Sequence, residues 1–261
     1  MLIGMDFLDR DSVRIAYEVH NPGGPQTGLL LSHGFGATSG MWQHNVAALS
    51  ADRPVVAWNQ RGHGDSDSPE DSSKYGHEQC LADMAALLDT VGLDRAILVG
   101  MSLGGYLSLM FYLAHPERVA ALVLVDTGPG FRNDAARDRW NETALRRADT
   151  IERDGSLGGG STEVGQARHR DVRGVAHAAR HVLTQVDGQV IDSLPRIAVP
   201  TLVVVGSDDT NFLGAADYMQ RSIPGARKVV IDNAGHASNL DQPAAFNTAV
   251  TDFLESLTPA R

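Results

Sequence analysis

The chain has 261 residues, of which 43% are hydrophobic and 21% charged, and its formal net charge at pH 7 is −10. This composition predicts one globular unit with a full core, and the acidic balance excludes nucleic acid and anionic membranes as expected partners. No apolar run reaches membrane-spanning length, and the amino terminus lacks a basic region followed by an apolar core, so we expect a cytoplasmic protein.

Strand and helix patterns alternate along most of the chain, as in a doubly wound α/β sheet. Short β-branched and aliphatic runs predict strands at residues 13–18, 28–32, 54–58, 96–100, 120–125, 201–206 and 228–232, with a candidate edge strand at 5–8. Apolar residues at helical spacing predict helices at residues 42–49, 76–91, 103–115, 212–222 and 244–257. No internal repeat interrupts this order.

The run Leu29–Ser32 reads as a buried strand and leads directly into the loop His33-Gly34-Phe35-Gly36. Gly34 and Gly36 let this loop turn tightly enough to aim the Phe35 amide N–H. The ring of His33 has two interpretations: a second base, or a buried ring that is hydrogen-bonded within the loop. We favour the buried ring.

The next motif is a serine between two glycines at the end of a strand. The run Ala96–Gly100 ends in G-x-S-x-G, with Ser102 at its centre, and a helix-compatible run follows at once. A strand, a serine and a helix in this order are typical of a nucleophile elbow, in which a sharp turn lifts the hydroxyl above the sheet. We expect the N–H groups of Leu103 and Phe35 to form an oxyanion hole there. The alternative is a surface turn with an incidental serine.

The alternation breaks between residues 128 and 194, which separate the predicted core segments 1–127 and 195–261. A glycine-rich stretch, Leu157–Ser161, interrupts this region. Apolar residues recur at helical spacing at Trp140, Ala144, Leu145 and Ala148. We predict an ordered helical cap inserted after the sixth strand, which would exclude water and shape a pocket, with the glycine-rich break as a point of movement. The alternative is a disordered surface insertion.

A serine hydroxyl is a poor nucleophile near neutral pH, so it needs a base and an orienting acid. His236 follows the last predicted strand in a small-residue loop and is the candidate base. Asp209 is the candidate acid, three residues after the strand that ends at Gly206. Asp208 cannot face His236 together with Asp209, because adjacent side chains leaving a strand point in different directions. Asp126, at the end of another strand, is the competing acid.

Together these motifs resemble the α/β-hydrolase superfamily, in particular its capped esterases, enol-lactonases and cofactor-free haloperoxidases. The resemblance extends from about Arg14 to Leu257. Its further landmarks are Asn59–Ser66, Pro200-Thr201, and Gly235–Leu240 with Pro243. It implies a mostly parallel, twisted, eight-stranded sheet with helices on both faces, a helical cap, and a triad in the order Ser102, Asp209, His236. One departure is Trp58-Asn59-Gln60, where many relatives carry an acidic residue and small neighbours.

The predicted chemistry is acyl transfer through a covalent intermediate, on an ester or lactone of a small molecule. The same machinery also fits a carbon–carbon bond hydrolase or a perhydrolase, and a different class, a non-catalytic small-molecule receptor, stays open. No metal or organic cofactor is expected. His177 and His181 stand four residues apart without an obvious third ligand, so we expect solvated side chains there. A homo-oligomer is left open.

Overall fold

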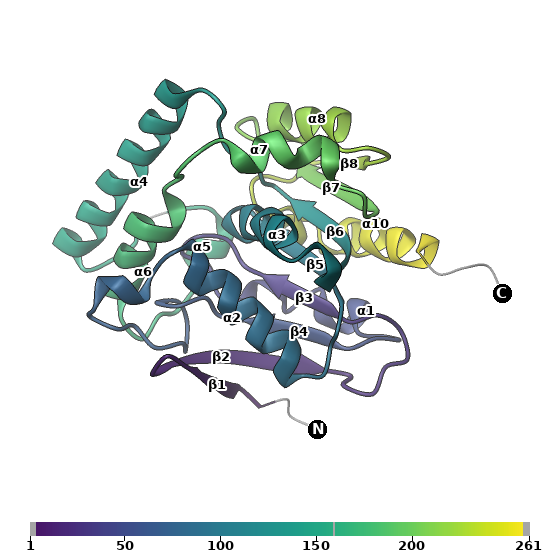
Figure 1. Cartoon of the computed structure of the whole chain (residues 1–261), viewed down its shortest axis with the longest axis horizontal. Coiled ribbons are helices and arrows are strands. Elements are labelled where there is room, and N and C mark those ends of the chain that lie inside the picture. Colours follow the sequence, from purple (N-terminus) through teal and green to yellow (C-terminus); the bar gives the residue numbers. More distant parts are fainter. Residues whose placement is uncertain (1–3, 159, 258–261) are drawn as a thin grey trace.

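Eight strands form one sheet in the order β1-β2-β4-β3-β5-β6-β7-β8 (Figure 1). β2 pairs antiparallel with both β1 and β4, whereas every later pair is parallel. The computed structural model describes residues 4–158 and 160–257. The strands span Asp6–Arg10 (β1), Val13–His20 (β2), Leu29–Ser32 (β3), Val55–Trp58 (β4), Ala96–Met101 (β5), Val119–Val125 (β6), Thr201–Gly206 (β7) and Arg227–Ile231 (β8). The predicted fold class is confirmed, including the edge strand.

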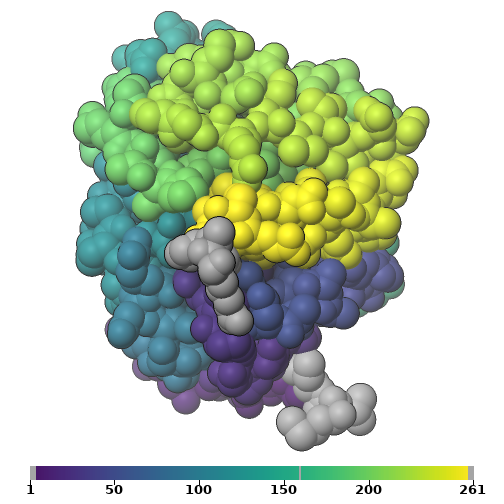
Figure 2. Space-filling model, turned by 90° about the vertical axis from the view of Figure 1, so that its right-hand side faces the viewer, coloured from purple at the N-terminus to yellow at the C-terminus, as the bar shows by residue number. Residues whose placement is uncertain are grey.

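Helices cover both faces of the sheet, so the central strands are apolar at consecutive positions. Along β3, Leu29 and Leu31 belong to one core layer and Leu30 to the other, as the two-residue period of a strand requires. One layer contains α2 (His77–Thr90), α3 (Leu103–Ala114) and α8 (Leu213–Ser222). The other contains α1 (Val46–Leu49) and α10 (Pro243–Ser256). Figure 2 shows α10, in yellow, across one face of the molecule. It lies between the amino-terminal segments, in purple and blue, and the yellow-green part of the chain that precedes it.

The helix predicted over residues 42–49 is wrong in extent. A 3-10 turn covers Ser39–Trp42, and α1 begins only at Val46. Between them lies Asn45, a fully buried residue whose side-chain amide donates to the Asn239 carbonyl at 3.3 Å. This tertiary bond fixes the chain where the helix was expected to continue.

The segment from 128 to 194, called the insertion below, forms helices and no strand within its described residues. These are α4 (Asp134–Asp154), α5 (Thr162–Gln166), α6 (Val172–Ala178) and α7 (Gln189–Ser193), with a π-helical turn at Ala179–Leu183. The long helix α4 stands at the edge of the molecule and packs beside α6 (Figure 1).

α4 has sequence-encoded ends. It begins where the Asn133 side chain accepts from the Ala136 N–H at 2.9 Å, and it ends at Gly155, which adopts a left-handed φ of 62°. Ala144 and Ala148 are buried, as the periodicity predicted. Leu145 is 40% exposed, because it lies beside the face of α4 that packs against the rest of the protein. Gly159 of the glycine-rich break lies outside the described residues. None of the helices in the described ranges has the length and apolar composition that a membrane span requires.

Candidate active site

Ser102 lies at the sharp turn between β5 and α3. Its backbone has φ 51° and ψ −116°, a conformation that costs energy for a residue with a side chain. The two flanking glycines make the turn possible: a Cβ on Gly100 would overlap the backbone of Gly104, and one on Gly104 would overlap the carbonyl of Ser32. The strand, the helix and β3 can approach each other this closely only because both positions are glycine.

The structure brings Ser102, His236 and Asp209 into one hydrogen-bonded chain. Nδ1 of His236 lies 2.7 Å from Asp209 Oδ2, and Nε2 lies 3.1 Å from Ser102 Oγ. The carboxylate can only accept, so Nδ1 carries the proton and Nε2 is free to accept from the serine hydroxyl. The three residues follow β5, β7 and β8, whose carboxyl ends lie at the same edge of the sheet.

The surroundings of His236 favour its protonated form. Burial lowers its pKa, but the hydrogen bond and the charge of Asp209 outweigh this effect, with smaller contributions from the charges of Asp126 and Glu163. The net result is a pKa above the ordinary value of a histidine. The ring of Phe212 stacks on the imidazole with centroids 4.8 Å apart. The imidazole can therefore take a proton from Ser102 and hold it as imidazolium.

The loop after β3 lies against the same turn. No acceptor among residues 4–158 and 160–257 is bonded to the backbone N–H of Phe35 or of Leu103. The neighbouring Gly36 N–H, in contrast, donates to Nε2 of His63 at 3.2 Å. Leu103 is the first residue of α3, so its N–H is also at the positive end of the helix dipole.

His33 is fully buried and has both ring nitrogens engaged. Nδ1 donates to the Gly34 carbonyl at 2.7 Å, and Nε2 accepts from the Gln60 N–H at 3.0 Å. Burial lowers the pKa of His33 to about 3, with the Gly34 hydrogen bond acting in the opposite direction. The structure therefore supports the buried, hydrogen-bonded ring rather than a second base.

Asp126 does not contact the imidazole. One of its carboxyl oxygens accepts from the Gly206 N–H at 2.8 Å, and the other accepts from the N–H and hydroxyl of Ser238 at 2.9 and 2.7 Å. Burial raises the pKa of Asp126 to about 7, although these hydrogen bonds lower it. Asp208 is exposed. Of the three aspartates considered from the sequence, only Asp209 is hydrogen-bonded to His236.

A family model described as "Alpha/beta hydrolase family" matches residues 29–249. The chain belongs to the alpha/beta hydrolase family. It is similar to 3-oxoadipate enol-lactonase 1 of Acinetobacter baylyi, with 27% identity over 88% of this chain and 89% of that protein. A solved enol-lactonase from Burkholderia xenovorans is 26% identical and has a TM-score of 0.76, with 96% of this chain and 100% of that chain covered. A thermophilic esterase from Thermogutta terrifontis is 25% identical and has a TM-score of 0.80, with 97% of this chain and 99% of that chain covered. The resemblance drawn from the motifs is confirmed.

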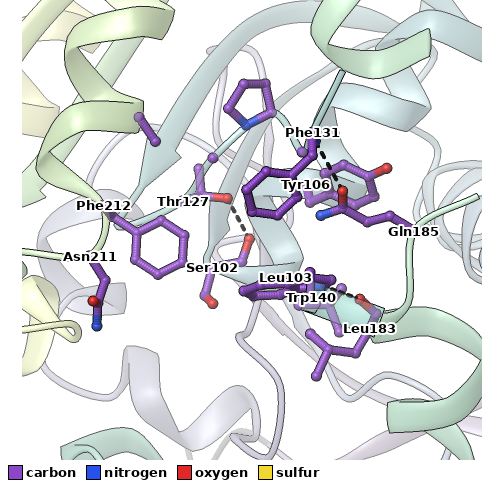
Figure 3. Close-up of a pocket in the computed structure, with 14 residues that line it drawn as sticks. Ser102, Leu103, Tyr106, Thr127, Phe131, Trp140, Leu183, Gln185, Asn211 and Phe212 are labelled. Carbon is purple, nitrogen blue, oxygen red and sulfur yellow. Dashed lines mark hydrogen bonds between the residues drawn. The ribbon is translucent and has the colours of Figure 1, made fainter. Parts of the chain in front are cut away.

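A chamber of about 330 Å³ opens beside Ser102 between the core and the insertion of this α/β-hydrolase (Figure 3). The core contributes residues that follow β5, β6 and β7. The insertion contributes its first four residues, Trp140 of α4, Leu183 of the π-helical turn, and Gln185. The side chains that form most of its wall are Leu103, Tyr106, Phe131, Trp140, Leu183, Gln185 and Phe212. Phe131, Gln185 and Phe212 were not predicted as site residues. Phe131 and Phe212 each lie six residues after a strand end, and such aromatic residues are a signal that a sequence offers.

The paired histidines of the insertion differ from the prediction. His181 is exposed, but His177 is half-buried and its ring stacks on Tyr75 with centroids 5.0 Å apart. The expectation of two solvated side chains is therefore wrong for His177, because the insertion packs against the core there. In the described part of the chain, no three His, Cys, Asp or Glu side chains are grouped so that they could hold a metal ion.

Proposed function

We propose that this chain is a serine hydrolase that cleaves a carboxylic ester or lactone of a small molecule through an acyl-enzyme. The observation that carries this proposal is the hydrogen-bonded order of Ser102, His236 and Asp209, with distances of 3.1 and 2.7 Å. Family membership supports it, as does the likeness to an enol-lactonase and an esterase.

In the first half of the reaction, Ser102 Oγ attacks the carbonyl carbon while its proton moves to Nε2 of His236. The negative charge that develops on the carbonyl oxygen is held by the N–H groups of Phe35 and Leu103. His236 then gives its proton to the leaving alkoxide as the carbon–oxygen bond breaks, and the acyl group remains on Ser102. Asp209 keeps the imidazole in the correct tautomer and stabilises its cation.

In the second half, His236 removes a proton from water, and the resulting hydroxide attacks the acyl carbon. The proton returns to Ser102 Oγ as the acid leaves, so the enzyme is restored. In this scheme the insertion serves as a cap that excludes bulk water from the acyl-enzyme. The mechanism needs no group besides these side chains and N–H donors.

Replacing Ser102 by Ala tests the proposal. We expect the rate of p-nitrophenyl acetate hydrolysis to fall by about 10³-fold or more, because the covalent route is lost. Thermal unfolding should be nearly unchanged, since the substitution removes one hydroxyl. Ser156→Ala, at an exposed position of the insertion, is the matched control and should keep wild-type activity. A folded Ser102→Ala protein with wild-type turnover would overturn the proposal.

A further inference from the structure

The chamber beside Ser102 is apolar and carries no charged side chain. Its walls are aromatic and aliphatic, and its polar members are Ser102, Thr127, Gln185 and Asn211. An unpaired carboxylate or ammonium group placed there would lose its hydration without gaining a counter-ion. The chamber therefore selects an uncharged group.

Two polar groups of the chamber wall are already used within the protein. The Trp140 indole N–H donates to the Leu183 carbonyl at 2.8 Å, which leaves the carbon face of the ring to the chamber. Thr127 Oγ1 donates to the Ser102 carbonyl at 2.6 Å. These bonds, drawn as dashed lines in Figure 3, remove two donors from those that a bound molecule could use.

The Gln185 side chain also lines the chamber, and its orientation is fixed by the protein. Its backbone N–H and carbonyl are both held by the Asn141 side chain at 2.8 Å. Its side-chain oxygen accepts from the Phe131 N–H at 3.1 Å, so the amide cannot flip without placing two donors face to face. Gln185 Nε2 has no acceptor among the described residues, although the residue is only 8% exposed. Figure 3 shows this nitrogen turned toward the middle of the view, where the other chamber residues lie.

We propose that the chamber binds an uncharged, ring-sized part of the ester that carries a hydrogen-bond acceptor, to which Gln185 Nε2 donates. This inference rests on the proposed function and names its substrate class. The volume of about 330 Å³ is roughly twice that of the ~150 Å³ cavity that accepts benzene, so a substituted ring fits. A fixed, nearly buried donor discriminates because a substrate without an acceptor leaves it unpaired.

The test uses two ester series that differ only in the ring substituent. One series contains p-nitrophenyl esters of 4-acetyl-, 4-isopropyl- and 4-carboxyphenylacetic acid, and the other contains acetates of the corresponding benzyl alcohols. Acetyl and isopropyl have nearly the same shape, but only acetyl accepts a hydrogen bond. We expect kcat/KM for the acetyl compound to exceed that for isopropyl by roughly 2- to 10-fold in at least one series. In that series the carboxy compound should be at least ~100-fold poorer than acetyl.

Gln185→Glu is the diagnostic variant, because it keeps an acceptor for the Phe131 N–H and removes the donor. It should abolish or reverse the preference for acetyl over isopropyl. Gln220→Glu adds the same charge at an exposed position of α8 and should keep the preference. If p-nitrophenyl acetate is hydrolysed but the wild type shows no acetyl preference, or the carboxy compound is equally good, the inference is wrong. The inference is also overturned if folded Gln185→Glu keeps the wild-type preference for acetyl over isopropyl. If Gln185→Glu does not fold, the comparison of acetyl, isopropyl and carboxy compounds with the wild-type enzyme decides the question. If no ester is hydrolysed at all, the proposed function fails instead.

Discussion

Asp126 joins the two loops that carry the candidate acid and base. Through Gly206 it holds the end of β7, from which Asp209 follows, and through Ser238 it holds the loop that presents His236. The carboxyl makes all three of these bonds as an acceptor, and its own backbone takes a left-handed φ of 45°. A residue that tolerates this strain while bonding both loops acts as a positioning residue.

Asparagine substitutions separate this role from that of the acid. Asp209→Asn should lower kcat by about three to four orders of magnitude, because the imidazole loses its anionic partner and is held in the wrong tautomer. Asp126→Asn should lower kcat by roughly 10- to 100-fold, because the new amide places a donor against the donors of Gly206 or Ser238.

Asp208→Asn, at an exposed position, is the control for these variants and should change little. A nearly inactive Asp126→Asn together with an active Asp209→Asn would show that the acid follows β6.

Sequence alone could name Ser102, Asp209 and His236 as candidates, because each is tied to a local pattern, a strand end followed by small residues. The positioning role of Asp126 could not be predicted from the sequence, for a physical reason. Its partners Gly206 and Ser238 lie 80 and 112 residues away along the chain. A lone aspartate at a strand end looks the same whether it faces an imidazole or two backbone amides.

At the scale of elements, His169 connects the insertion to the candidate oxyanion loop. Its Nε2–H donates to the Gly36 carbonyl at 3.1 Å, and its Nδ1 accepts from the Gly64 N–H at 3.1 Å. From the other side, His63 accepts from the Gly36 N–H. Two neutral imidazoles thus hold both polar groups of Gly36, next to the Phe35 N–H. The insertion thereby positions the loop as well as covering it.

His169→Ala tests this connection. We expect kcat to fall by about 10-fold, less than the 10²–10³ that follows removal of an oxyanion donor outright, with a smaller change in KM. The affinity for a phenylboronic acid, whose adduct with Ser102 would place an oxygen in the same position, should fall in parallel. His181→Ala removes an exposed imidazole from the same insertion and serves as the control. Unchanged boronate affinity in His169→Ala would show that the loop does not depend on the insertion.

Periodicity predicted the long elements well, as α2, α3, α4 and α10 show. It did not resolve α5, α6 and α7, which span five to seven residues each. Helices of this length are unstable alone and depend on tertiary contacts. The contact of His169 with Gly36 likewise joins residues 133 positions apart, which no local pattern reports.

The whole molecule buries ionisable groups whose effects on stability have opposite signs. Burial lowers the pKa of His33 to about 3 and that of His63 well below its ordinary value. The unfolded chain takes up these protons near pH 6.5, so the stability that the two neutral rings contribute is lost as the pH falls below that value. Asp126 acts in the opposite direction, because its pKa of about 7 makes the folded state bind a proton that the unfolded chain releases near pH 4.

Between pH 7 and pH 5 the two histidines outweigh the one carboxyl. With these three groups alone, the free energy of unfolding should fall by roughly 1–2 kcal/mol over this range. His63→Gln removes one histidine, so its free energy of unfolding should fall less steeply than that of the wild type from pH 7 to pH 5. Asp126→Asn removes the opposing group, so its stability should fall more steeply than that of the wild type. Urea unfolding at pH 7, 6 and 5 measures all three slopes. Parallel curves for the three proteins would mean that these buried groups do not set the acid sensitivity of the fold.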